Sequence, residues 1–138
     1  MKVLVSNCLL GINCRYKGDN CKNENVLEFL KDKEVIGICP EVEGGLPTPR
    51  DPSEIVNDKV ISKAGKDVTY EYKKGAEIAL KLAQDNKVDL VLFKAKSPSC
   101  GSGLIYDGTF TGNKIPGNGI AADLLIKHGF KVITEEDL

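Results

Sequence analysis

The alternation of hydrophobic and polar positions predicts four buried strands and three helices. Short apolar runs rich in β-branched residues are typical of strands buried on both faces, and they occur at residues 2–6, 34–39, 88–95 and in the stretch 130–138, which also holds the tail. Apolar residues at a spacing of three to four predict amphipathic helices, and they occur at residues 23–33, 72–87 and 119–129. Strand and helix alternate along the chain, which predicts an α/β layer fold with a mainly parallel sheet.

Three other segments carry turn-forming residues rather than a periodic pattern. Residues 40–52 hold four Pro and two Gly, which predicts an ordered loop. Residues 60–72 are irregular and have room for a small hairpin, while LIYDGTFTG at 104–112 alternates around Asp-Gly, a hairpin pattern.

With 138 residues the chain has the length of one domain. We therefore predict a single three-layer, Rossmann-like α/β domain over residues 1–138.

Charge and hydropathy narrow the classes of function. The chain has 19 Lys and Arg against 20 Asp and Glu, a net charge of −1, so no basic field favours DNA. No apolar run approaches the roughly 20 residues of a membrane span. The first residues, MKVLVSN, are too short and too strand-like for a signal peptide. We expect a cytoplasmic protein with neither a DNA nor a membrane partner.

The five cysteines are the residues with the most distinctive chemistry. In a reducing cytosol they are not expected to form structural disulfides, and their odd number excludes complete internal pairing. Inert core thiols, a metal or cluster site, and a catalytic thiol remain as alternatives. Burial is the simplest of these, because free cysteine is among the most buried residue types.

The positions of three cysteines favour a metal or cluster site. Cys8 lies just past the first predicted strand, Cys39 ends the second and Cys100 follows the third. If the sheet is parallel, all three lie at its carboxyl edge, where ligands of such sheets bind. Chance burial of thiols would not favour that edge, so the pattern predicts three thiolates converging on one crevice.

The remaining candidates for metal ligands are weaker. Structural zinc usually takes four Cys or His ligands in paired short spacings. The only close pair is Cys14 and Cys21, with six residues between them in a polar stretch, and the only histidine, His128, is expected at the surface. Three thiolates without histidine suit an iron–sulfur cluster and would leave one of four irons open. We expect Cys14 and Cys21 to be loop thiols and not cluster ligands, although a zinc site with Cys8 stays possible.

Several polar residues near these thiols have candidate roles. Glu41, two residues after a cysteine, has the chemistry of a general base, or it pairs with Arg50. Ser97 offers a hydroxyl to a ligand, or it bonds its own turn. Arg15 and Tyr16 could hydrogen-bond or stack on a planar ligand. Glu41 and Ser97 are therefore our candidate catalytic residues, and Arg15, Tyr16 and Arg50 our candidate substrate-binding residues.

Five stretches together resemble the thiouracil desulfidase (TudS-like) family, formerly a domain of unknown function. They are SNCLLG…CRYKG, CPEVEGGLPTPRDPSEI, KDVTYEYKKGA, KSPSCGSGLIYDGTFTG and GNGIAADLL, which span nearly the whole chain. The combination CPE…GGL…PR…SPSCG is far more specific than any of its pieces.

The resemblance implies a cofactor, an activity and a set of roles. It implies a [4Fe–4S] cluster on Cys8, Cys39 and Cys100, with Glu41 and Ser97 as the functional carboxylate and hydroxyl. The implied reaction removes sulfur from a thiouracil-type thiolated base without net electron transfer, and the implied partner is the iron–sulfur assembly machinery. Two alternatives stay open, namely a cluster-free sulfur carrier with a persulfide on Cys100 and a zinc-stabilised binding module.

Overall fold

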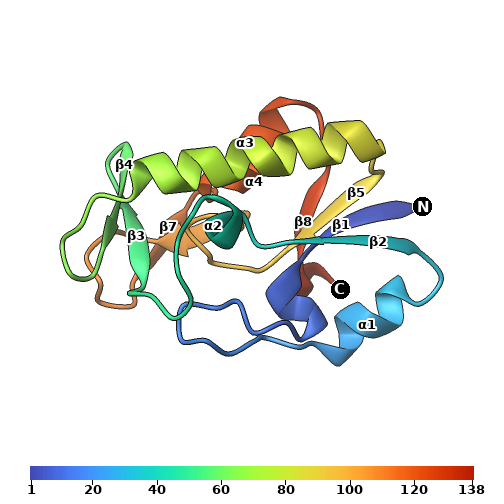
Figure 1. The fold of residues 1–138 in the computed structure, drawn as a ribbon, viewed down its shortest axis with the longest axis horizontal. Helices are drawn as coiled ribbons and strands as arrows, with labels where there is room; N and C mark the ends of the chain where they lie inside the picture. The colour runs from blue at the N-terminus through green and yellow to red at the C-terminus, as the bar shows by residue number, and fades with distance from the viewer.

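A parallel four-stranded sheet lies at the centre of the computed structural model, which describes residues 1–138 (Figure 1). The strand order is β2-β1-β5-β8, with β1 (Lys2–Ser6), β2 (Glu34–Ile38), β5 (Leu90–Phe93) and β8 (Val132–Thr134). Strand β1 pairs in parallel with both β2 and β5, and β5 pairs in parallel with β8. The chain order therefore reverses at β1, which opens a crevice beyond the carboxyl ends of the central strands.

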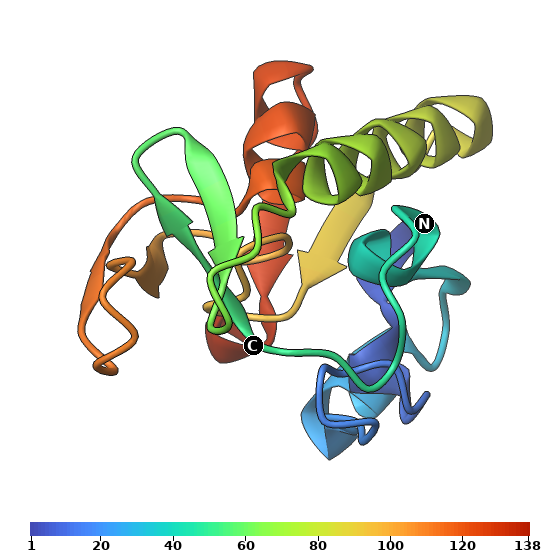
Figure 2. The same cartoon turned by 60° about the vertical axis from the view of Figure 1, so that its left-hand side comes forward.

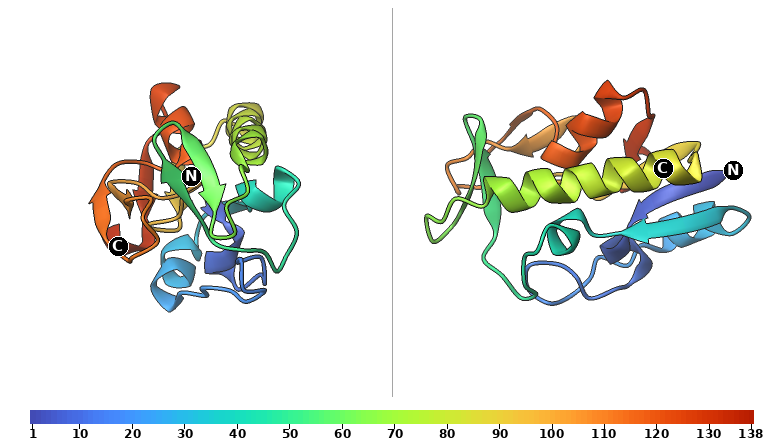
Figure 3. Two further views of the ribbon diagram at one scale, coloured as in Figure 1. Left: turned by 90° about the vertical axis from the view of Figure 1, so that its left-hand side faces the viewer. Right: turned by 45° about the horizontal axis from the view of Figure 1, so that its top comes forward.

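Helices cover both faces of this sheet. Helices α3 (Thr69–Asn86) and α4 (Ile120–Lys127) lie on one face, and α1 (Glu24–Leu30) with the 3-10 turn η1 (Asn7–Leu10) lies on the other (Figures 1 and 3). Because side chains alternate along a strand, Leu4 packs under α3 and α4 while Val3 packs toward α1. The predicted three-layer, Rossmann-like α/β fold with a mainly parallel sheet is confirmed.

One helix lies where a loop was expected. Helix α2 (Pro40–Glu43) opens the segment 40–52, so the loop prediction was wrong for these four residues. Proline suits the first turn of a helix because that N–H has no partner there. The helix packs closely on α3 through Gly75 and Gly44: a Cβ on Gly75 would overlap the carbonyl of Pro40, and one on Gly44 the carbonyl of Glu71.

Two hairpins lie beside the sheet (Figure 2). The first joins β3 (Ser53–Val56) to β4 (Lys59–Ser62). It turns at Asn57, whose φ of 59° is tolerated by asparagine. Beyond β4 the chain also folds back within residues 60–72, as expected, through an antiparallel bridge between Ile61 and Asp67. The second joins β6 (Leu104–Tyr106) to β7 (Lys114–Pro116) through a longer loop than the Asp-Gly pattern suggested.

The longer loop has a clear structural cause. The carboxylate of Glu54 on β3 accepts hydrogen bonds from the backbone N–H of Gly108 at 3.0 Å and of Phe110 at 3.2 Å. These contacts hold the loop of residues 107–113 against β3, and the chain returns to pair with β6 only at Lys114.

None of the helices combines the length and apolar character needed to cross a membrane.

Candidate active site

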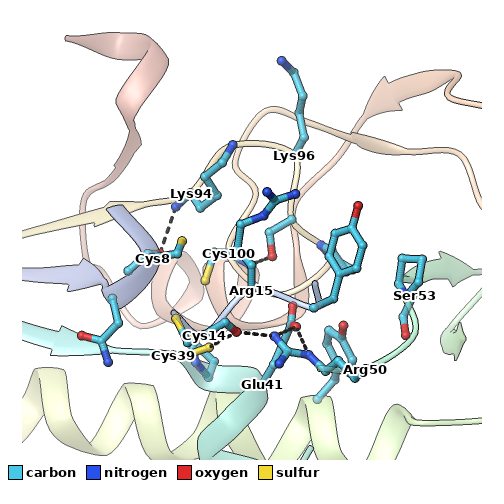
Figure 4. Close-up of a pocket in the computed structure, with 18 of the residues that line it drawn as sticks. Cys8, Cys14, Arg15, Cys39, Glu41, Arg50, Ser53, Lys94, Lys96 and Cys100 are labelled. Carbon is cyan, nitrogen blue, oxygen red and sulfur yellow. Dashed lines mark hydrogen bonds and ion pairs between the residues drawn. The ribbon is translucent and has the colours of Figure 1, made fainter. Parts of the chain in front are cut away.

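A cavity of about 440 Å³ lies at the carboxyl edge of the sheet (Figure 4). All eight residues that the sequence singled out line it: Cys8, Arg15, Tyr16, Cys39, Glu41, Arg50, Ser97 and Cys100. They come from three strand ends and from loops that lie far apart in the chain, between Cys8 and Cys100. The structure thus brings the candidates together, while their individual roles stay predictions.

The three strand-end cysteines occupy the edge that their positions predicted. Cys8 lies in η1 directly after β1, Cys39 is the N-cap of α2 directly after β2, and Cys100 lies in the turn after β5. Cys8 and Cys100 are buried and Cys39 is half-buried. Because the three strands are parallel, they end at the same edge of the sheet. The thiols that follow them therefore share one wall of the cavity.

The turn that carries Cys100 is fixed by α4. The carbonyls of Pro98 and Ser99 accept hydrogen bonds from the first free N–H groups of the helix, those of Ile120 at 2.8 Å and Ala121 at 2.9 Å. These contacts satisfy donors that a helix N-terminus otherwise leaves unpaired. They also place the positive end of the α4 dipole beside the turn, which favours a negative charge on the Cys100 sulfur.

Ser97 holds the same turn from inside. Its Oγ accepts hydrogen bonds from the backbone N–H of Ser99 at 3.1 Å and of Cys100 at 3.0 Å. The turn role considered for Ser97 is therefore present. Because both of these bonds use Oγ as an acceptor, the hydroxyl proton is still available to a ligand in the cavity.

In the absence of a metal, the thiols favour the protonated form. Burial raises the pKa of the Cys100 thiol, and contact with the Cys14 side chain together with burial raises that of Cys39. A buried thiol with a raised pKa is inert as a nucleophile, which disfavours a persulfide carrier on Cys100. The same groups become good ligands once a metal displaces their protons.

Cys14 is placed differently from the expectation of an exposed loop thiol. It is buried, lines the cavity, and neighbours the thiols of Cys39 and Cys8. Cys39 acts to lower the pKa of Cys14, but Cys8 and burial outweigh it and raise that pKa to about 11. Polar neighbours in the sequence suggested exposure, whereas the loop folds back so that Cys21 N–H donates to the Cys8 carbonyl at 2.9 Å. Cys21 itself lies outside the cavity lining.

Glu41 and Arg50 form a close ion pair beside the thiols. Arg50 Nε and Nη2 both donate to Oε2 of Glu41, at 2.9 and 2.6 Å, and the two side chains are only 7% and 14% exposed. The other Arg50 donors bond to the carbonyls of Cys14 and Pro47 and to Oγ1 of Thr48. All five guanidinium hydrogens therefore have partners within the chain, and Oε1 of Glu41 is not used by Arg50.

The rim of the cavity carries Arg15 and Tyr16. The guanidinium carbon of Arg15 lies 5.1 Å from the centre of the Tyr16 ring, and its Nη1 pairs with Asp19 at 3.2 Å. The backbone N–H of Arg50 donates to the Tyr16 carbonyl at 2.7 Å and ties this loop to the wall that carries Glu41. A flat cation and an aromatic ring at the mouth can stack on a planar ligand.

Sequence reasoning missed several polar residues of the lining, among them Tyr72, Lys94 and Lys96. Tyr72 on α3 is buried beside Glu41 and Ser53, and burial raises its pKa well above the ordinary value, so its hydroxyl stays a donor. Lys94 and Lys96 follow β5, where Lys94 pairs with Glu135 and Lys96 with Glu136. The two lysines could have been found from their place at a strand end, as the cysteines were, whereas nothing in the helical pattern marks Tyr72.

The donor set fits a cluster better than a single ion. No three Cys, His, Asp or Glu side chains converge closely enough to hold one metal ion, which disfavours a zinc site on Cys8, Cys14 and Cys21. A [4Fe–4S] cube is larger and holds its thiolates apart around itself. Soft thiolate donors, with no histidine among the lining residues, suit such a cluster.

Comparison with known proteins identifies the family. A family model described as 2-thiouracil desulfurase matches residues 3–137. The uncharacterized protein YbbK of Bacillus subtilis (strain 168) is 42% identical over 146 residues, covering 99% of this chain and 97% of that protein. A solved structure of the [4Fe-4S]-dependent thiouracil desulfidase TudS superposes with a TM-score of 0.91 at 42% identity, covering 99% of this chain and 92% of that one. The resemblance seen in the sequence is confirmed, and the chain belongs to the 2-thiouracil desulfurase family.

Proposed function

We propose that this protein is a [4Fe–4S]-dependent desulfidase that hydrolyses the thiocarbonyl of a thiouracil-type base and releases sulfide. The observation that carries the proposal is the meeting, in one cavity, of three strand-end thiols and a carboxylate fixed by an arginine. The family and the solved relative support the same chemistry. Residues 1–138 form one domain, because the lining residues of this single cavity come from the parallel sheet, its helices and both hairpins.

Cys8, Cys39 and Cys100 would hold the cluster. Cys8 and Cys39 follow β1 and β2 closely, Cys100 lies in the turn after β5, and the α4 N-terminus beside that turn favours an anionic sulfur at Cys100. When bound, the cluster supplies a Lewis-acidic iron that draws electron density from the thiocarbonyl sulfur. The protein must then supply the proton transfers and hold the base in place.

Glu41 is the group that activates water. Arg50 fixes Oε2 of Glu41, so the other carboxylate oxygen accepts a proton from a water that attacks the thioamide carbon. The arginine holds the carboxylate in a fixed orientation. Because every donor of Arg50 is already used, we assign it the positioning of Glu41 in place of the direct substrate contact suggested by the sequence.

The other lining residues orient the base. The free hydroxyl proton of Ser97 can bond to an acceptor on the pyrimidine, while Arg15 and Tyr16 cover its planar face. Tyr72, protonated beside Glu41, is a second donor near the carboxylate. Expulsion of water by these side chains strengthens each of their electrostatic contacts with the substrate.

The cellular setting follows from the same chemistry. An iron–sulfur enzyme of this type depends on the iron–sulfur assembly machinery and works in the reducing cytoplasm, where its thiols stay free to receive the cluster. The substrate is a small thiolated base, since the cavity of about 440 Å³ must also admit the cluster.

The test is anaerobic reconstitution followed by assays for iron, acid-labile sulfide and sulfide release from 2-thiouracil. We expect about four irons and four sulfides per chain, with uracil and hydrosulfide formed in equal amounts. A protein that takes up sulfur without iron would instead support the persulfide carrier. A protein that binds only zinc, or a loaded protein that releases no sulfide from any thiolated pyrimidine, would overturn the proposal.

A further inference from the structure

Four thiols line the cavity, although the proposed cluster site uses three. Cys8, Cys39 and Cys100 follow strands, whereas Cys14 comes from the loop between η1 and α1. Cys14 is only 7% exposed, and its thiol neighbours those of Cys8 and Cys39. It is therefore part of the same group of thiols and not an isolated cysteine.

Cys14 also contacts the wall that carries the carboxylate. Its carbonyl accepts hydrogen bonds from Arg50 Nη2 at 2.9 Å and from the Cys39 thiol at 3.8 Å. Figure 4 shows Cys14 beside Cys39, next to the Glu41–Arg50 pair. The residue thus lies between two proposed cluster ligands and the proposed general base, which is the region that a reacting thiocarbonyl has to occupy.

We propose that Cys14 is a fourth, exchangeable ligand, which caps the iron left free by Cys8, Cys39 and Cys100 until a substrate sulfur replaces it. This inference rests on the proposed function. It gives the Cys14 thiol the role of an exchangeable ligand, which differs from the roles of a permanent ligand and of a cysteine that never binds the cluster. A permanent fourth ligand would block the substrate, and a spectator would have no reason to sit inside the thiol group.

The exchange is a simple ligand substitution. The bond between iron and the Cys14 sulfur breaks, the sulfur keeps the electron pair, and the released thiolate takes a proton from solvent water. A lone pair of the substrate sulfur forms the new bond to the same iron. No group is oxidised or reduced, so the exchange fits a hydrolytic reaction without electron transfer.

The experiment compares ligand access to that iron in wild type, Cys14→Ala and Cys14→Ser, with Cys21→Ser as the matched control outside the cavity. Each protein is reconstituted anaerobically, adjusted to equal iron content and reduced. Cyanide is then titrated as a small external ligand, with electron paramagnetic resonance of the reduced cluster as the readout. The cluster-loss rate in air without substrate is measured separately by visible absorption.

An internal ligand lowers the apparent affinity for an external one by the fraction of time that the iron is free. If Cys14 occupies the iron about 90% of the time, cyanide binds about tenfold more tightly to Cys14→Ala than to wild type. We also expect a changed resting spectrum and faster cluster loss in air for both Cys14 variants, with Cys21→Ser unchanged.

Each other outcome has a distinct meaning. If all proteins hold a cluster and Cys14→Ala matches wild type in spectrum and cyanide affinity, the exchangeable ligand is refuted and the proposed function stands. If both Cys14 variants fail to hold any cluster while Cys21→Ser does, Cys14 is a permanent ligand and the exchange is refuted. If wild type itself takes up no iron, the proposed function fails first.

Discussion

The two walls of the cavity are built in different ways. The thiol wall, formed by Cys8, Cys39 and Cys100, lies at the carboxyl edge of the parallel sheet, where strand register places the first two and a turn held by α4 places the third. The carboxylate wall, formed by Glu41 and Arg50, depends on side-chain hydrogen bonds that span nine residues of chain. Under the proposed function, the first wall would decide whether the cofactor is held, and the second would decide whether the held cofactor supports turnover. Changes to each wall should therefore fail in different ways.

The largest expected effect comes from the thiol wall. Cys8→Ser, Cys39→Ser and Cys100→Ser should each lose the cluster, because an alcohol is a poor ligand for iron and an exchangeable Cys14 cannot replace one of the three lasting ligands. Visible absorption and iron content after anaerobic reconstitution measure this. Cys21→Ser is the control and should load normally. A variant of the thiol wall that loads like wild type would remove that residue from the ligand set.

The carboxylate wall should fail without loss of cofactor. Glu41→Gln keeps the size of the side chain and an acceptor for Arg50, but it can no longer take a proton from water. General bases contribute about 100-fold to 10,000-fold, so turnover per cluster should fall by that factor while iron content is unchanged. Sulfide release at equal iron content is the measurement. Near-normal turnover would show that another group activates the water.

Arg50→Lys is the companion variant for Glu41→Gln. It keeps the positive charge beside Glu41 but lacks the planar guanidinium that bonds to four separate groups. Turnover should fall by less than in Glu41→Gln, because the base is present but less well oriented. A fall equal to that of Glu41→Gln would mean that Arg50 acts on the substrate as well.

Helix α2 joins the two walls, so a change beneath it should affect both moderately. Cys39 is the N-cap of this helix and Glu41 lies in its first turn. In Gly75→Ala the new methyl group would overlap the Pro40 carbonyl and push α2 away from α3. Overpacking of this kind costs about 1–3 kcal/mol, measured as the free energy of unfolding in urea. Iron content and turnover should both fall partially, whereas the exposed neighbour variant Lys74→Ala should change neither.

The smallest effect is expected at the rim. Arg15→Ala removes a partly exposed guanidinium that lies over Tyr16, and contacts of this type are worth about 0.5–1 kcal/mol. KM for thiouracil should rise about two- to fivefold, with kcat and iron content unchanged. A large fall in kcat would place Arg15 among the catalytic residues. The catalytic residues would then not be confined to the two walls.

The parts of the molecule that were predictable share a local cause. Buried β-branched runs reveal central parallel strands, and residues directly after such strands must lie at one edge of the sheet. Cys8, Cys39 and Cys100 could therefore be grouped from the sequence. Glu41 could be grouped as well, because it lies only two residues beyond Cys39.

The parts that were missed depend on contacts between distant segments. Burial of Cys14 depends on a loop that folds back on η1 and is bonded by Arg50, neither of which leaves a local pattern. Helix α2 is too short for a periodic pattern, and its place depends on Gly75 in another helix. The second hairpin was displaced because a carboxylate on β3 holds the 107–113 loop.

The position of β5 in the centre of the sheet has a consequence for how the protein is made. Four of the five cysteines leave the ribosome before Cys100 and before the strand that completes their surroundings. At usual synthesis rates, the 61 residues from Cys39 to Cys100 take roughly 3 to 12 seconds. During that interval the early thiols are unshielded on a nascent chain, open to stray metals and oxidants. Chaperoning and a reducing environment thus matter before any cofactor arrives, and cofactor delivery becomes a step that follows translation.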